Sequence, residues 1–444
     1  MLTTKVMQKI FFRIYEKFLK AFVFFKTRKM NNLSSEECDF WVHRIQGTGL
    51  ECVTSPLNRP VVILHGASVG ELNGIFPVVR GLRNSGFKGS IFVSVGTFTG
   101  FKKAVSVARN LSFEVVPAPF DFHEPVSRFF QSSVPDLFVT FEAEYWPVTH
   151  AFLSNLGVAT LLCNGRISYR SFRVYRLLEG VFKDIFQRLW RAGMVSHGDK
   201  LRIIDLGADP SRVHVTGNSK HEELFETCRN FKYSPSEWAE MLDIGKDTRV
   251  FVAGSLRSNE CNMIVDVCSK IIKKFDNVKC ILVPRHLGRV SQLAELLNRK
   301  AIPCSFLSRV LQGLEKPKER VLIVDLMGFL FDIYALGDAV FCGGSLVPIG
   351  GHNIMEPIAR GRKVIYGPYI SKVKSEQELL QSLGCGVMVK NAKELERVVV
   401  NFITNPHEGR VPRDKYEKIR RSFYGVSKTY VRWIVDWLRE RHQL

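Results

Sequence analysis

Three glutamates of this 444-residue chain follow apolar runs that are typical of parallel strands. Glu71 follows the run Val61–Leu64 through the turn HGASVG, and residues with helical spacing come after it. Glu142 directly follows the run Asp136–Phe141, and in an extended chain Glu144 points the same way. Open α/β sheets bind ligands at the carboxyl ends of their strands, so these side chains are candidates for chemistry. The alternatives are that a helix dipole favours Glu71 and that Glu142 or Glu144 caps a helix.

A glycine-rich stretch in the second half of the chain indicates a phosphate site. The sequence VFCGGSLVPIGGHNIMEPIARGRKVIYGP, residues 340–368, predicts a strand at 339–342, a glycine loop, a helix that carries Glu356, and a strand at 363–366. Free backbone N–H groups in such a loop, together with a positive helix end, can hold a phosphate. A carboxylate one turn into the helix can accept hydrogen bonds from ribose hydroxyls. The spacing is not GxGxxG, so a plain strand-to-helix connection is the alternative.

The same alternation of strand and small or polar turn runs through most of the chain and predicts an α/β protein. The further strands are expected at 91–95, 115–118, 160–163, 213–216, 250–253, 278–283 and 321–324. A chain of 444 residues exceeds one ordinary core, so we expect two Rossmann-like domains with a cleft between them. Residues 225–247 are polar and irregular and are interpreted as the linker. The expected domains are 45–225 and 246–410, followed by a C-terminal helical segment at 411–444.

The composition indicates an anionic partner. The chain has 63 Lys and Arg against 43 Asp and Glu, a formal net charge of +20. Such a charge suits nucleic acid, acidic lipid or an anionic substrate. The basic residues are spread along the chain and no RNA-binding signature is present, which argues against nucleic acid. Ten cysteines without a CxxC pair indicate reduced thiols and no structural zinc.

The first 30 residues predict an amphipathic helix at a membrane surface. One helical face carries apolar side chains and the opposite face carries charges. The apolar face consists of Met7, Phe11, Ile14, Phe18, Phe22 and Phe25. The charged residues Lys9, Arg13, Glu16, Lys17 and Lys20 make a bilayer span costly, so the helix is expected to lie in the interface. The alternative is that it packs on the protein itself.

Seven motifs in order carry a resemblance to a known family. They are HGASVGE (65–71), FEAEYWP (141–147), CNGRIS (163–168), GNSK (217–220), VPRH (283–286), DLMG (325–328) and GGSLVPIGGHNIMEP (343–357). The set resembles the Kdo transferases, the 3-deoxy-D-manno-octulosonic acid transferases of lipopolysaccharide synthesis, over residues 61–368. The resemblance implies a GT-B type fold. It also implies transfer of Kdo from CMP-Kdo to the lipid A precursor, lipid IVA, at the cytoplasmic face of the inner membrane.

The resemblance also assigns roles to residues. It implies that Glu71 is the catalytic base and that Glu142 and Lys220 stabilise the transition state. The donor contacts that it implies are Pro284, Arg285, Met327, Gly328, Phe329, Asn353, Ile354, Met355 and Glu356. The family often carries Glu where this chain has Phe329.

These roles agree with the chemistry of the transfer. A sugar hydroxyl needs a positioned base as it attacks, and cations can hold the charge on departing CMP. A single displacement inverts the anomeric centre. CMP is a monophosphate and the chain has no DxD-like pair, so we expect no required metal and no cofactor. The number of Kdo units added, one or more than one, stays open. The alternatives are another GT-B sugar-nucleotide enzyme, a non-enzymatic basic nucleic-acid-binding protein and a membrane-surface scaffold.

Overall fold

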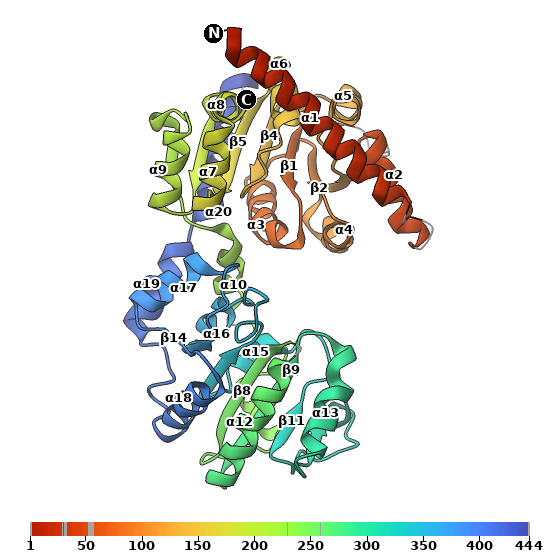
Figure 1. Ribbon diagram of the computed structural model, residues 1–444. Helices are drawn as coiled ribbons and strands as arrows, with labels where there is room; N and C mark the ends of the chain where they lie inside the picture. Colours follow the sequence, from red (N-terminus) through yellow and green to blue (C-terminus); the bar gives the residue numbers. More distant parts are fainter. Residues whose placement is uncertain are drawn as a thin grey trace. The chain divides into compact units, whose positions relative to one another are not determined.

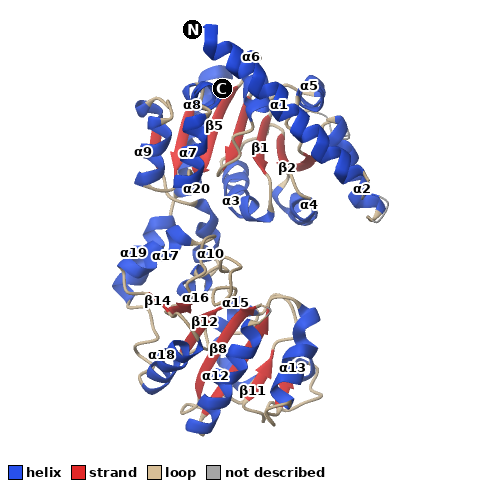
Figure 2. Ribbon diagram, in the orientation of Figure 1, coloured by secondary structure: helices blue, strands red, loops and turns tan. Residues whose placement is uncertain are grey.

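The computed structural model describes residues 2–28, 30, 33–51, 57–228, 230–257 and 259–442, without the side chains of residues 2–9, 26 and 442. The chain divides into two compact units. The first contains residues 1–223 and 422–444, and the second contains residues 224–421. The predicted C-terminal segment 411–444 is therefore shared: α20, Val426–His442, belongs to the first unit, and α19, Arg413–Phe423, begins in the second. Each unit is a parallel sheet covered by helices (Figures 1 and 2).

The first unit has seven parallel strands in the order β3-β2-β1-β4-β5-β6-β7. The strands are β1 Val62–Gly66, β2 Ile91–Val95, β3 Glu114–Pro117, β4 Leu137–Phe141, β5 Ala159–Gly165, β6 Arg191–Met194 and β7 Val213–Val215. The helices are α1 Leu2–Thr27, α2 Ser35–Gln46, α3 Val69–Asn84, α4 Phe98–Leu111, α5 His123–Ser132, α6 Pro147–Asn155, α7 Tyr169–Leu177, α8 Glu179–Gln187 and α9 His197–Asp205. The strand order reverses between β1 and β4, and such a switch point is where this class of sheet binds ligands.

The second unit repeats the design in the order β10-β11-β9-β8-β12-β13-β14. Its strands are β8 Arg249–Leu256, β9 Val278–Pro284, β10 Cys304–Phe306, β11 Val321–Ile323, β12 Ala339–Cys342, β13 Val364–Tyr366 and β14 Gly386–Met388. Its helices are α11 Pro235–Met241, α12 Glu260–Lys274, α13 Val290–Asn298, α14 Leu307–Leu311, α15 Leu330–Tyr334, α16 Met355–Ala359, α17 Lys374–Ser382 and α18 Ala392–Thr404, while α10, Glu222–Glu226, starts in the first unit. Here the switch point lies between β8 and β12.

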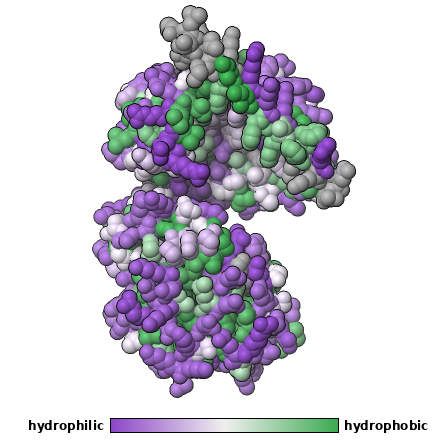
Figure 3. Space-filling view, viewed as in Figure 1, coloured by the Kyte–Doolittle hydropathy of each residue, from purple (hydrophilic) through white to green (hydrophobic). Residues whose placement is uncertain are grey.

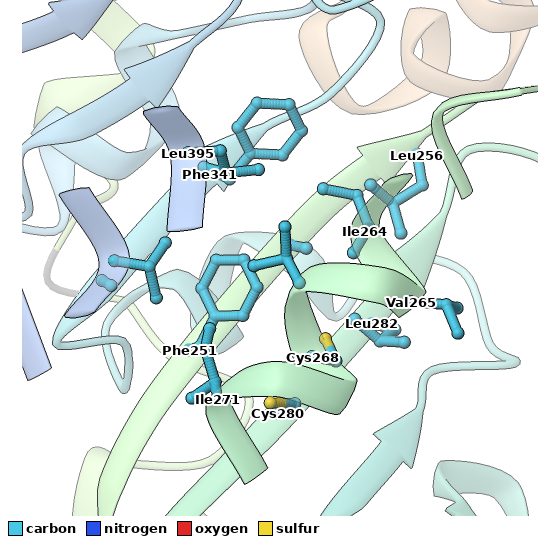
Figure 4. Packing of buried hydrophobic residues seen from close by; sticks show 14 of the residues in the cluster. Phe251, Leu256, Ile264, Val265, Cys268, Ile271, Cys280, Leu282, Phe341 and Leu395 are labelled. Carbon is cyan, nitrogen blue, oxygen red and sulfur yellow. The ribbon is translucent and has the colours of Figure 1, made fainter. Parts of the chain in front are cut away.

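The core of the second unit explains why these strands are continuous apolar runs in the sequence. A parallel sheet is covered on both faces, so both sets of alternating side chains are buried. Figure 4 shows one side of this core, where Phe251, Phe341 and Leu282 of the sheet pack against α12, including Ile264 and Cys268. All of these residues are fully buried. The expected strands of the sequence are confirmed within three residues at each end.

The predicted linker is wrong, because much of residues 225–247 is folded into the second unit. Helix α11 lies within it and begins with a capping box, in which Ser234 and Glu237 satisfy each other's backbone N–H groups. Trp238 is fully buried between Leu242 and neighbours from the sheet. A single buried Trp in a polar stretch gives no helical period, so the sequence pattern alone did not reveal this element.

Helix α1 is formed as expected, and it packs on the first unit along one side. Val23 is buried, Leu19 is half-buried, and the hydroxyl of Tyr15 donates to Asp121 at 3.0 Å. The alternative, that the helix packs on the protein itself, therefore holds for that side. Phe11, which was expected on the free face, is half-buried against a second hydrophobic cluster of the first unit, which includes Phe182. No helix among the described residues has the length and apolarity that crossing a bilayer requires.

The other side of α1 stays uncovered and keeps most of the predicted apolar face. The exposed side chains are Ile10, Ile14, Phe18, Phe22, Phe24 and Phe25. Phe18 is 70% exposed, an unusual value for a phenylalanine. We call these six residues the α1 strip. In Figure 3, green hydrophobic and purple hydrophilic surfaces lie side by side where Figure 1 draws α1.

Candidate active site

Glu71 lies in the first turn of α3, directly after the switch-point strand β1. One carboxylate oxygen, Oε2, accepts hydrogen bonds from the backbone N–H of Ser68 at 2.8 Å and from the Ser68 hydroxyl. Ser68 is the N-cap residue, so the pair forms a capping box. No described group donates to the other oxygen, Oε1, and the side chain is half-buried. The structure thus shows that Glu71 caps the helix while one oxygen stays available to a ligand.

Glu142 begins the turn after β4, the other strand of the switch point, and forms an ion pair with Lys220. Its Oε1 lies 2.5 Å from Nζ of Lys220, and the two side chains are 15% and 22% exposed. Lys220 also approaches α3, since a Cβ added to Gly70 would lie 3.4 Å from Nζ. Glu71, Glu142 and Lys220 therefore meet at one sheet edge, although 149 residues separate the first from the last.

The expectation that Glu142 and Glu144 point the same way is wrong. The backbone of Glu142 has a φ of 60°, a left-handed conformation that ends the strand. A residue other than glycine pays a cost of order 1–3 kcal/mol for such a conformation, and these costs gather at functional sites. Glu144 consequently turns to other partners, accepting from Nε1 of Trp146 at 2.5 Å and lying 3.7 Å from Nε2 of His65.

A buried hydrogen-bond network places Lys220 at this edge. Nδ2 of Asn164 donates to the Ser219 hydroxyl at 2.9 Å, and the Ser219 N–H donates to Oδ1 of Asn164 at 3.0 Å. The Ser219 hydroxyl in turn donates to the Gly74 carbonyl of α3 at 3.0 Å. The hydroxyl of Tyr430, on α20, accepts from the Asn164 N–H at 2.8 Å. The network joins four segments of the first unit that are distant in sequence.

The sequence offered only part of this network. The motifs CNGRIS and GNSK contain Asn164 and Ser219, but neither was predicted to have a role. Asn164 also has a positive φ of 52°, which a sequence does not reveal. Tyr430 lies in a segment that was predicted only to be an amphipathic helix. Asn164, Ser219 and Tyr430 are positioning residues, because each acts through the loop that carries Lys220.

The predicted donor-site residues collect at the carboxyl edge of the second unit. Pro284 ends β9 and Arg285 follows it, Met327 and Gly328 lie between β11 and α15, and Asn353 precedes α16. Met327 is 60% exposed, whereas Ile354 and Met355 are fully buried and can offer a ligand only backbone groups. The ring of Phe329 packs edge-on against Trp238 at 5.9 Å between centroids. Its side chain serves the core of the unit.

Glu356 is a half-buried carboxyl at this edge. Nδ2 of Asn353 donates to its Oε1 at 3.2 Å. Burial raises the pKa of Glu356 to about 7, and the Asn353 hydrogen bond and the charge of Arg285 oppose that rise. A carboxyl with this pKa changes its protonation near neutral pH and accepts hydrogen bonds from hydroxyls when it is ionised.

The start of the glycine loop after β12 does not offer free N–H groups to a phosphate, so the expectation is wrong for residues 344–346. The carboxylate of Glu260, a fully buried residue, accepts the N–H groups of Gly344 at 2.7 Å, Ser345 at 3.1 Å and Leu346 at 3.0 Å. A buried carboxylate needs such partners, and the loop supplies them. The start of the loop is therefore built around an internal carboxylate, and these three N–H groups are not available to a ligand.

Similarity to known proteins extends over most of the chain. The profile of the 3-deoxy-D-manno-octulosonic-acid transferase (Kdo transferase) family matches residues 41–223. The chain is 30% identical over 368 residues to a 3-deoxy-D-manno-octulosonic acid transferase of Chlamydia pneumoniae, covering 82% of this chain and 81% of that protein. It is 32% identical over 340 residues to a bifunctional glycosyltransferase/methyltransferase of Fusobacterium nucleatum, covering 76% of this chain and 51% of that protein, so it spans about half of that relative's length.

Solved structures support the fold. A UDP-GlcNAc 2-epimerase from Neisseria meningitidis aligns with a TM-score of 0.54 at 10% identity, covering 85% of this chain and all of that one. At that identity the likeness concerns the fold alone, which is of the GT-B type with two Rossmann-like units. Identity to curated relatives over four-fifths of both chains is a stronger finding. The chain belongs to the family of 3-deoxy-D-manno-octulosonic acid transferases, the Kdo transferases, which are enzymes.

Proposed function

We propose that the chain transfers Kdo from CMP-Kdo to the lipid A precursor, lipid IVA, with inversion at the anomeric carbon. The observation that carries the proposal is the meeting of Glu71, Glu142 and Lys220 at the switch point of the first unit, in a chain of this family. Oε1 of Glu71 takes the proton of the attacking hydroxyl, and the ion pair of Lys220 and Glu142 stabilises the charge that develops. CMP binds at the edge of the second unit, near Arg285, the segment Met327–Phe329 and the segment Asn353–Glu356.

The direct test is to incubate the chain with CMP-Kdo and lipid A precursor and to weigh the product by mass spectrometry. The expected product is heavier than the acceptor by one Kdo residue, or by a ladder of Kdo residues that gives the number of transfers. An unchanged acceptor mass, with the donor intact, contradicts the proposal.

Glu356 offers a test of the donor site. We expect Glu356→Ala to weaken CMP binding by about 1–3 kcal/mol, because the ribose hydroxyls lose this acceptor. Calorimetry measures the change, and Glu295→Ala, at an exposed position on α13, is the control. Equal CMP affinity in wild type and Glu356→Ala contradicts the assignment.

The raised pKa of Glu356 predicts a pH dependence of the same interaction. The carboxyl stays largely protonated below its pKa of about 7, so the ionised acceptor forms as the pH rises from 6 to 8. The CMP affinity of wild type should therefore increase from pH 6 to pH 8 relative to that of Glu356→Gln, which has no titrating side chain at this position. The CMP phosphate titrates in both measurements, so its effect cancels when the two affinities are compared at each pH. A ratio of the two affinities that stays constant from pH 6 to pH 8 contradicts the prediction.

The α1 strip supports binding to the cytoplasmic face of the inner membrane. Its apolar side chains are exposed on one side of α1, and the cations Arg13, Lys17 and Lys20 lie beside them on the helix surface. This pattern is that of an interfacial helix with basic residues toward anionic headgroups. Because the opposite side of α1 packs on the first unit, membrane binding there leaves the fold intact.

Point variants test the α1 strip better than a deletion, which would uncover Val23 and its neighbours. We expect Phe18→Ser combined with Phe25→Ser to release the protein from anionic liposomes in co-sedimentation, and high salt to weaken the binding of wild type. The control is Leu177→Ser, since Leu177 is 85% exposed but lies on α7. If the double variant sediments like wild type, the strip does not carry membrane binding.

A further inference from the structure

Cationic side chains surround the switch point of the second unit and have no role so far. Arg257 follows β8 and His352 follows β12, the two strands between which the order reverses. Nε of Arg257 donates to Nε2 of His352 at 3.4 Å, so the imidazole holds the guanidinium. Lys372 packs against the same loop, since a Cβ added to Gly350 would lie 3.0 Å from its Cγ. We call Arg257, His352 and Lys372 the switch-point cluster.

The electrostatics of His352 show that several cations face this position. Burial, followed by the charges of Arg285, Arg257, Lys372 and His286, lowers the pKa of His352 to about 4. The ring is therefore neutral at pH 7 and accepts from Arg257 through Nε2. In the part of the chain that the structure describes, neither Arg257 nor Lys372 forms an ion pair with a carboxylate. The nearby carboxylate of Glu260 is occupied by backbone N–H groups.

The geometry leaves the outer edge of the Arg257 guanidinium available. Nε is used by His352, and no described residue accepts from the two Nη groups. A guanidinium edge binds a carboxylate with two parallel hydrogen bonds, and this pairing is stronger than neutral ones. Cations gathered at a ligand-binding edge without an internal counter-charge indicate an anionic ligand.

We propose that the switch-point cluster binds the carboxylate of the donor sugar, with Arg257 as the binding residue, His352 as its positioning residue and Lys372 as a second cation. The inference rests on the proposed function, because an octulosonic acid linked to CMP carries two anions. One is the phosphate and the other is the carboxylate on the carbon from which CMP departs. In this proposal Arg285 and Glu356 bind the CMP part of the donor, and the switch-point cluster binds the carboxylate of the sugar. A neutral sugar nucleotide would leave the cluster uncompensated.

The test separates the sugar acid from the nucleotide. For Arg257→Ala we expect the KM for CMP-Kdo to rise at least tenfold, while the inhibition constant of CMP changes less than twofold. Arg257→Lys should recover part of the loss, and His352→Ala should raise KM by a smaller factor. Lys374→Ala, an exposed cation on α17 that pairs with Glu378, is the control and should leave both constants unchanged.

Two outcomes overturn the inference. A KM that equals the wild-type value in Arg257→Ala shows that the cluster does not hold the donor. An inhibition constant for CMP that rises by the same factor as KM shows that the cluster binds the phosphate instead. Transfer by the unmodified chain is measured first, and its absence overturns the proposed function and not the assignment of the cluster. When the wild type is active, the KM for CMP-Kdo and the inhibition constant of CMP are sufficient to test the inference.

Discussion

Glu71→Gln should keep the fold and CMP affinity but lose at least about a hundredfold in the rate of Kdo transfer. A general base contributes about 10²–10⁴ in rate, whereas helix-terminus stabilisation by a carboxylate is worth roughly 0.3–1 kcal/mol. Glutamine preserves the capping box, because its side-chain oxygen can accept from Ser68 as the glutamate does. The substitution therefore removes proton acceptance and leaves the geometry of α3. Single-turnover transfer with saturating CMP-Kdo measures the effect.

The chain contains its own control for this experiment. Glu237 occupies the same position of a second capping box, at the start of α11, and is exposed. Glu237→Gln should change the melting temperature as little as Glu71→Gln does and should leave the transfer rate unchanged. EDTA should leave the wild-type rate unchanged as well. If Glu71→Gln transfers Kdo at nearly the wild-type rate, the role of Glu71 is only to cap α3. Glu142 then becomes the next candidate for the base.

Much of the fold followed from the sequence because buried parallel strands are apolar on both faces. Runs such as Ile91–Val95 and Ala339–Cys342 carry that signal strongly, and their observed bounds match the expected ones. The strands that were not predicted are short and lack the signal. Arg191–Met194 has no β-branched residue, and Gly386–Met388 starts with glycine. These strands are defined by their neighbours in the sheet, which a local pattern does not record.

The site was harder to predict from the sequence, because its decisive features are contacts between segments that are distant in the chain. The glycine loop suggested free N–H groups, yet Glu260, which occupies three of them, lies 84 positions before Gly344. The left-handed backbone of Glu142 likewise has no signature in FEAEYWP. The sequence placed Glu71, Glu142 and Lys220 at strand ends, and the parallel sheet brought those ends to one edge. For Glu71, the hydrogen bonds from Ser68 then decided which carboxylate oxygen stays available.

The second large effect is expected at Lys220. Lys220→Met should lower the transfer rate by about 10²–10³, which is the range for removing one preorganised group that stabilises developing negative charge. CMP affinity should stay the same, because the proposed CMP contacts all belong to the second unit. The variant also leaves Glu142 without its partner, and an unpaired, largely buried carboxylate destabilises the fold. A melting temperature measured beside the rate is therefore required.

A double variant separates the structural part of that effect from the chemical part. In Glu142→Gln combined with Lys220→Met no charge is left unpaired, so we expect the melting temperature to return toward wild type while the rate stays low. The control is Arg80→Met, which breaks the more exposed ion pair of Arg80 and Glu223 in the same unit and should leave the rate nearly unchanged. If the double variant recovers the wild-type rate, the ion pair only holds the turn in place. If the rate stays low in a stable protein, the pair of Lys220 and Glu142 acts in the transfer step itself and does more than hold the turn in place.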